Sequence, residues 1–254
     1  MSFTLWNSTN QSVKDVIFWI YAPVKETSTQ QYVNINASHS YEIETDELGN
    51  QILEFTFMEL PPYAAKIIDI EAHLMLSNRL NKKPIQQFKR YIRPEKYCES
   101  DHSLIIDLAK KLIDENPLKT SNRIFKWVSG NVTYSGYTKN TRGALYSIRE
   151  RKGDCTEFSY LFTALCRANG INARTVGGYI CHDNSVIKPG GYHNWAEFYD
   201  NDRWKMVDPQ RKVFVKNQLQ YIVMRILGES TIDSGNEDGL FGCIGEGVEV
   251  KMNG

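Results

Sequence analysis

Short apolar runs separated by turn residues cover roughly the first 85 residues of the chain. The runs are rich in Val, Ile, Tyr and Phe, which favour β-strands, and they span residues 13–24, 31–60 and 63–76. Turn formers such as Gly49-Asn50 interrupt them. The pattern predicts a β-rich N-terminal region.

The alternation stops where Lys, Arg and Pro accumulate, over residues 81–101. A change of composition of this kind is typical of a boundary between domains. We therefore predict two domains, an N-terminal β-rich domain at residues 1–88 and a second domain at residues 89–254.

Helical periodicity follows the boundary. The segment 103–116 has the apolar spacing of one helical face, with Ser103 as the expected cap and Pro117 as the expected stop. A second helix is predicted within residues 119–134. A third is predicted from residue 155, where apolar residues repeat at helical spacing before a glycine stop.

Three short strands are predicted after the third helix, at residues 173–181, 193–200 and 203–209. The tail, residues 235–254, is glycine-rich and carries the pattern of one terminal strand. Helices followed by an antiparallel sheet make the second domain α+β.

Charge and hydropathy exclude several classes of partner. The chain has 254 residues, and its 30 Lys plus Arg balance its 30 Asp plus Glu, so no net field favours nucleic acid or an anionic membrane. The longest apolar run near the N-terminus, residues 16–24, is too short to span a bilayer. We expect no nucleic-acid or membrane partner and a cytoplasmic location.

The cysteines of the chain also indicate a cytoplasmic location. They are odd in number and contain no C-x-x-C pair, which argues against a disulfide framework and against a structural zinc site. We expect free thiols in a reducing compartment and no metal or cofactor. The five are Cys98, Cys155, Cys166, Cys181 and Cys243.

Cys155 differs from the other cysteines in its position. It directly follows Gly153-Asp154 and begins the predicted third helix. Free amides and the positive end of the helix dipole stabilise a thiolate there, and the same amides can bind an oxyanion. The local pattern leaves a small, unreactive buried residue as the alternative.

A thiol nucleophile needs a base and a group that orients the base. His193 begins a predicted strand directly after a flexible loop, a position that favours chemistry over packing. If Asp200 and Asn201 form a two-residue turn, Asp208 lies directly opposite His193 in the hairpin. A turn one residue later makes the contact diagonal and still leaves the pair close.

These residues lie in segments that resemble the transglutaminase-like superfamily, in its bacterial branch. The resemblance covers roughly residues 90–215 and rests on "GALYSIRERKGDCTEFSYLFTALCRANGINARTVGGYI" followed by "HNWAEFYDNDRWKMVDP". It implies a papain-like core of helices packed on an antiparallel sheet, preceded by an N-terminal β-sandwich similar to that of some bacterial members.

The resemblance also implies roles for particular residues. It makes Cys155 the nucleophile, His193 the base and Asp208 the orienting group. Trp127 resembles a tryptophan near the nucleophile whose indole joins the oxyanion hole, with a core aromatic as the alternative. A narrow aromatic tunnel around Trp195 and Trp127 would line the substrate site and favour an amine acceptor.

The sequence departs from the family pattern at some positions. Asn172 stands where proline is common, and Asn194 stands where alanine or histidine is common. Neither is a member of the triad. The chain has no C-x-x-C zinc pairs of the peptide N-glycanase kind and no room for the C-terminal barrels of calcium-dependent animal transglutaminases.

We therefore expect cysteine-dependent acyl transfer at an amide of a peptide or protein, through a thioester on Cys155. The leading hypothesis is hydrolysis, as in a cysteine peptidase or amidase. The first alternative is a transamidase that uses an amine acceptor. The second is a binding module that uses the fold without chemistry, which retention of all three triad residues disfavours.

Overall fold

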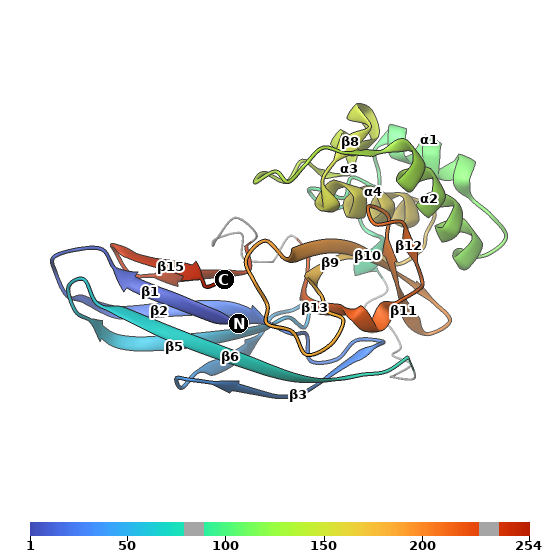
Figure 1. Ribbon diagram of the computed structural model, residues 1–254. Coiled ribbons are helices and arrows are strands. Elements are labelled where there is room, and N and C mark those ends of the chain that lie inside the picture. Colours follow the sequence, from blue (N-terminus) through green and yellow to red (C-terminus); the bar gives the residue numbers. More distant parts are fainter. Residues whose placement is uncertain (79–88, 229–238) are drawn as a thin grey trace.

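A computed structural model describes residues 1–78, 89–228 and 239–254. The fold is α+β, as predicted. An N-terminal β-sandwich lies beside a second sheet (Figure 1). Helices α4 (Cys155–Ala168) and α2 (Pro117–Asn131) contact that second sheet, and α1 (Ser103–Leu112) and α3 (Gly143–Glu150) pack on α4. Within the described residues, no helix combines the length and the apolar composition that crossing a membrane requires.

The sandwich consists of two four-stranded sheets. One has the order β15-β1-β6-β3 and the other β14-β2-β5-β4. The strands contributed by the first 76 residues are β1 (Ser2–Asn7), β2 (Val13–Ala22), β3 (Gln30–Ala37), β4 (Glu42–Thr45), β5 (Gln51–Leu60) and β6 (Ala65–Leu76).

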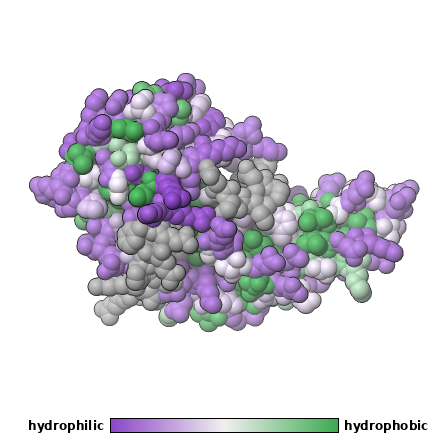
Figure 2. Space-filling view, turned by 180° about the vertical axis from the view of Figure 1, so that it is seen from behind, coloured by the Kyte–Doolittle hydropathy of each residue, from purple (hydrophilic) through white to green (hydrophobic). Residues whose placement is uncertain are grey.

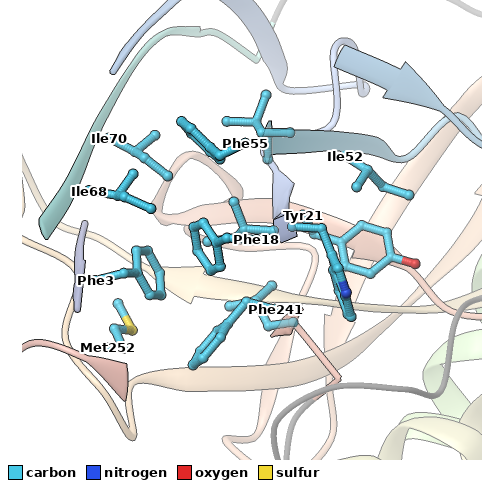
Figure 3. Packing of buried hydrophobic residues seen from close by; sticks show 14 of the residues in the cluster. Phe3, Phe18, Tyr21, Ile52, Phe55, Ile68, Ile70, Phe241 and Met252 are labelled. Atoms are coloured by element: carbon cyan, nitrogen blue, oxygen red, sulfur yellow. The ribbon is translucent and has the colours of Figure 1, made fainter. Parts of the chain in front are cut away.

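The sandwich core follows from the period of two along its strands. Phe3 and Leu5 on β1 are both fully buried, and they alternate with partly exposed neighbours. Phe3 packs against Phe18 of the facing sheet with ring centroids 5.2 Å apart, and Phe18 packs against Phe55 at 5.6 Å (Figure 3). Aromatic and branched side chains from both sheets therefore fill one apolar interior.

The C-terminal tail completes both sheets of the sandwich. It forms two strands, β14 (Phe241–Ile244) and β15 (Val248–Met252), rather than the single strand expected. β14 pairs with β2, and β15 pairs with β1. The predicted division placed this tail in the 89–254 domain, whereas its strands lie in the N-terminal sheets. Pairing between segments so far apart in sequence leaves no local pattern to predict it.

The helical layer differs from the expectation at its boundaries. The cap of α1 (Ser103–Leu112) is His102 rather than Ser103, because the imidazole of His102 accepts from Leu104 N–H. Pro117 does not end that helix; it is the first residue of α2 (Pro117–Asn131), a position where its missing N–H is not needed. The sequence analysis did not predict α3 (Gly143–Glu150).

The central helix α4 (Cys155–Ala168) begins at the predicted residue and packs on a five-stranded sheet of order β12-β11-β10-β9-β13. The three predicted strands are present as β9 (Ala173–Ile180), β10 (Tyr192–Asp200) and β11 (Arg203–Asp208). Further elements are β7 (Thr133–Tyr134), β8 (Lys152–Gly153), β12 (Val213–Phe214), β13 (Tyr221–Ile226) and the 3₁₀ turns Arg90–Ile92 and Gln218–Gln220.

Buried hydrogen bonds join the sandwich to this sheet. The Gln30 side chain is fully buried and donates to Val24 C=O at 2.7 Å and to Val223 C=O at 3.1 Å. It also accepts from Val223 N–H at 2.9 Å. The apolar core of the sandwich continues into Tyr179 and Ile222 of the second sheet. The sandwich is thereby held against the strands that carry the candidate site.

The surface seen from behind the view of Figure 1 carries mostly polar side chains. Figure 2 shows a face that is mostly hydrophilic, with small separate hydrophobic patches. Such scattered apolar side chains are usual on globular proteins.

Candidate active site

The local sequence fixes Cys155 at the first position of α4. Asp154 caps the helix by accepting from Thr156 N–H at 2.8 Å, and Glu157 reaches back to accept from Asp154 N–H at 3.1 Å. Glu157 is fully buried and is paired with Arg142 at 2.7 Å. This capping box defines where the helix begins and leaves Cys155 partly exposed at its positive end.

One first-turn amide stays available beside the thiol. The N–H groups of Thr156 and Glu157 bond to the Asp154 side chain, and Phe158 N–H donates to Asp154 C=O at 3.2 Å. Among the described residues, no acceptor bonds to Cys155 N–H. A helix leaves its first four amides without internal partners, and here the cap satisfies all but this one.

His193 and Asp208 lie in hydrogen-bond contact, as predicted. His193 Nε2 is 2.7 Å from Asp208 Oδ2. The contact is diagonal rather than direct, because the turn residues are Asn201 and Asp202, with φ of 53° and 60°, and Asp200 pairs with Arg203. Two successive left-handed residues form the turn type that suits a two-residue hairpin.

The Cys155 thiol lies close enough to His193 to influence the imidazole. Since Nε2 contacts Asp208, Nδ1 is the ring nitrogen that faces the thiol. Burial alone lowers the pKa of His193, but the hydrogen bonds and charges of Asp208 and Cys155 raise it from 6.5 to about 9. The imidazole therefore lies beside both Cys155 and Asp208, and its raised pKa favours the protonated form.

Asp208 is held by three donors and is fully buried. Besides His193, Tyr221 O–H donates to Oδ2 at 3.0 Å, and Arg211 N–H donates to Oδ1 at 3.0 Å. Burial and the Asp208 carboxylate raise the pKa of Tyr221, so the phenol stays a donor. The sequence analysis missed Tyr221, because only the pairing of β13 with β9 brings it near Asp208.

The two predicted tryptophans do not occupy the substrate-facing positions expected of them. Trp195 is fully buried beneath the imidazole, stacked on His193 at 6.3 Å and packed edge-on against Tyr221 at 5.1 Å. Trp127 packs against the helical core with the guanidinium of Arg151 4.4 Å from its ring centroid. Neither side chain lines the cleft that contains Cys155 and His193. Trp195 therefore packs against the ring of His193 and does not face the cleft.

Asn194 links the strand of the base to the helix of the nucleophile. Its side-chain amide donates to Thr156 Oγ1 at 2.9 Å. Asn194 follows His193, and Thr156 follows Cys155, so one hydrogen bond joins the immediate neighbours of both reactive groups. The position that departs from the family pattern thus has a structural role.

A cleft of about 940 Å³ opens over Cys155 and His193. Four tyrosines line it, together with part of the C-terminal tail. The tyrosines are Tyr134, Tyr137, Tyr179 and Tyr192, and the tail residues are Leu240, Phe241, Val250, Lys251 and Met252. The sandwich therefore forms part of the wall of the candidate active site.

All five cysteines are free thiols, and Cys98 and Cys166 are fully buried. Burial raises the pKa of Cys98 to about 12 and also raises that of Cys166. In the part of the chain that the structure describes, no three His, Cys, Asp or Glu side chains group as a metal-ligand set.

Comparison with known proteins agrees with this arrangement. The family model described as "Transglutaminase-like superfamily" matches residues 106–209. No curated protein matches the chain. A crystal structure named "Putative Cysteine Protease from Cytophaga hutchinsonii" is 19% identical with a TM-score of 0.63, over 100% of this chain and 90% of its own.

Two further solved structures match less closely. The periplasmic domain of TgpA from Pseudomonas aeruginosa is 12% identical with a TM-score of 0.44, over 84% of this chain and 88% of its own. The transglutaminase of red sea bream is 9% identical with a TM-score of 0.40, over 87% of this chain and 50% of its own.

The whole-chain match to the Cytophaga structure shows a shared fold that includes the sandwich. The family match spans both Cys155 and Asp208 and contains His193 between them. Residues 106–209 of this chain are a domain of the transglutaminase-like superfamily.

Proposed function

We propose that the chain is a cysteine hydrolase that cleaves an amide bond of a peptide or protein. One observation carries the proposal: His193 is bonded to Asp208 and lies beside Cys155, and Cys155 and His193 both line one cleft. This is the arrangement that nucleophilic catalysis by a thiol needs.

The proposed chemistry proceeds in two stages. His193 already holds the proton of the Cys155 thiol when the Cys155 sulfur attacks the carbonyl carbon, and the amide C–N bond breaks as His193 passes that proton to the leaving nitrogen. Water then attacks the thioester, and the C–S bond breaks to release a carboxylic acid and the thiol. Asp208 holds the ring orientation throughout.

Cys155 N–H is the proposed donor to the developing oxyanion. It is the first-turn amide without a described partner, and it sits at the positive end of α4. It takes the role that the sequence analysis offered to Trp127. A main-chain donor on the nucleophile itself keeps its place when side chains around the cleft change.

The form of the cleft favours water over an amine as the acceptor. The predicted tunnel of Trp195 and Trp127 is not formed, since neither side chain lines the cleft. The walls instead carry exposed cations, Arg211 and Lys251. These cations disfavour a protonated amine by charge repulsion and do not exclude water from the thioester. Transamidation and a non-catalytic binding role are the alternatives.

Brief iodoacetamide treatment tests the nucleophile. Intact-protein mass spectrometry across a pH series, followed by peptide mapping, should show Cys155 alkylated first, at a pH below that of an ordinary thiol near 8.5. His193→Ala should remove this advantage. If Cys155 reacts no faster than Cys243, which is also partly exposed, the binding-module alternative becomes the better account.

A second assay separates the two acceptors. Dimethylated casein is incubated with the protein in the presence and absence of a dansyl-labelled primary amine. Hydrolysis predicts new carboxylate products and no incorporated dansyl group. Dansyl incorporation that depends on Cys155 would establish the transamidase instead.

The cytoplasmic location also stays a proposal. It rests on the five free thiols, which a reducing compartment preserves.

A further inference from the structure

The edge of β15 forms one wall of the catalytic cleft. The cleft contacts three consecutive residues of this strand, Val250, Lys251 and Met252. Side chains of a strand alternate between two faces, so a cavity that touches three residues in a row lies along the edge of the strand. The edge is also the outer one, because β15 ends the sheet order β15-β1-β6-β3.

The hydrogen-bond pattern shows which groups of β15 bond to its neighbour β1. At one end Ser8 N–H donates to Gly247 C=O at 2.9 Å, and at the other Asn253 N–H donates to Ser2 C=O at 2.8 Å. In an antiparallel pair, every second residue bonds to the same neighbour. The odd-numbered residues of β15 therefore bond to β1.

The even-numbered residues consequently face the other way. Val250 and Met252 direct their main-chain N–H and C=O groups to the edge that borders the cleft, while their side chains pack toward the sandwich core. No described residue pairs with this edge. Two main-chain donors and two acceptors are thus presented at strand spacing in the wall of the cleft that also contains Cys155.

The charges of the cleft indicate what kind of chain would bind there. Its cations, Arg211 and Lys251, are exposed, and no described carboxylate forms an ion pair with either. The carboxylate in its wall, Asp154, is buried and already accepts from Thr138 and Thr156. The exposed charges in the wall of the cleft are therefore positive.

We propose that the cleft binds an acidic peptide in extended conformation, which adds to β15 as a further strand. The main chain of the peptide bonds to Val250 and Met252, and its carboxylate side chains lie near Lys251 and Arg211. Strand addition positions a peptide through groups that every peptide has, and the cations select among side chains. This inference rests on the proposed function, since it places the peptide in the cleft of Cys155.

Reactive peptides test the proposal. The probes are iodoacetyl-Glu-Ala-Glu-Ala-amide and acetyl-Ala-Glu-Ala-Glu-chloromethyl ketone, which carry the peptide on opposite sides of the reactive carbon. Cys155 sulfur bonds to that carbon, the carbon–halogen bond breaks to release halide, and the thiol proton passes to His193 or buffer. The readout is the rate of Cys155 alkylation divided by the rate with iodoacetamide or chloroacetone, which carry no peptide.

We expect at least one Glu probe to exceed the peptide-free reagent by tenfold or more, and to exceed its Lys-for-Glu counterpart. A series N-methylated at each peptide nitrogen in turn should lose the gain at alternate residues only, by about tenfold per site, because alternate residues bond to one edge. A flat N-methylation series, or equal rates for the Glu and Lys probes, would overturn the proposal.

Variants of β15 test strand addition independently of the probe chemistry. Val250→Pro removes the N–H that faces the cleft and no bond to β1, a placement that an edge strand tolerates. It should abolish the gain of the Glu probe, whereas Val250→Ala, which keeps the N–H, should retain it. Equal gains in both variants would contradict strand addition, and the preference of iodoacetamide for Cys155 over Cys243 reports whether the site of each variant is intact.

Failure of the proposed function would look different. In that case Cys155 would show no preferred reaction even with iodoacetamide. The inference would then be read from fluorescence anisotropy of a labelled acetyl-Ala-Glu-Ala-Glu-amide peptide with Cys155→Ala, where binding lost on adding Val250→Pro supports strand addition and binding unchanged by it refutes it.

Discussion

His193 and Asp208 are bonded at 2.7 Å although they do not stand opposite each other in the sheet. Ala196 pairs with Val207, so the imidazole reaches the carboxylate along a diagonal of the β10–β11 hairpin. Diagonal neighbours on one face are within reach of long side chains. The contact then depends on what holds the carboxylate in place, namely Tyr221 and the main chain of Arg211.

The raised pKa of His193 predicts a pH dependence of stability. The folded protein binds this proton up to pH about 9, and the unfolded chain only up to 6.5. The resulting stabilisation is complete below pH 6.5 and is lost as the pH rises to about 9. We expect the loss to be on the order of 1 to 3 kcal/mol in urea unfolding.

The control for this prediction is His193→Gln, measured over the same pH range. The buried thiols Cys98 and Cys166 destabilise both proteins at higher pH, so the difference between the two curves isolates His193. Parallel curves for wild type and variant would show that the folded protein does not hold the proton in this way.

Tyr221→Phe should weaken the support of the base. It removes one of the three donors to Asp208, and we expect a loss of about 1 to 3 kcal/mol in the free energy of unfolding. A tenfold or larger fall in kcat/KM should accompany it. Tyr41→Phe is the matched control, because its hydroxyl donates to Ile35 C=O within the sandwich. Equal effects of both variants on kcat/KM would remove Tyr221 from the site.

Asn194 should act by positioning the reactive pair. Asn194→Ala removes the bond to Thr156 at 2.9 Å, and we expect slower alkylation of Cys155 together with a loss of about 1 kcal/mol in stability. Thr156→Ala should have the same effect on the alkylation rate. The double variant should be no slower than either single one. Additive effects would mean that the two side chains act separately.

Two glycines, Gly178 and Gly130, should respond in opposite ways to replacement by alanine. A Cβ on Gly178, which pairs with His193, would lie 1.9 Å from Ile222 C=O, a backbone atom that cannot move aside. Gly178→Ala should therefore destabilise the protein by about 3 kcal/mol or more. Gly130→Ala on α2 meets nothing within 4 Å and should stabilise by about 0.5 to 1 kcal/mol. Calorimetric melting of both variants checks the contrast.

Short-range sequence signals predicted the parts of the site that are built locally. Asp154 and Glu157 mark the start of α4, and the structure places Cys155 there. The three strands after α4 were equally readable from their alternation and turns. The register of the hairpin was harder to predict. Asp200, Asn201 and Asp202 all favour turns, and the structure uses Asn201 and Asp202.

Long-range pairing decided the rest. Tyr221 reaches Asp208 only because β13 pairs with β9, and Lys251 reaches the cleft only because the tail returns to β1. Trp195 and Trp127 were predicted to face the substrate, but they do not line the cleft. The position of an aromatic residue in the sequence does not determine where its side chain points. Whether it faces the ligand or the core depends on packing against other elements.

The sequence by itself predicted the α+β class, the position of Cys155 at the start of a helix and the closeness of His193 to Asp208, because capping, strand alternation and turn chemistry act over a few neighbouring residues. Only the tertiary structure decided the diagonal contact of His193 with Asp208, the donors that hold Asp208, and the place of the tail in the cleft wall. Those features arise where segments distant in the chain bury a common surface, and no local interaction encodes which segments will meet.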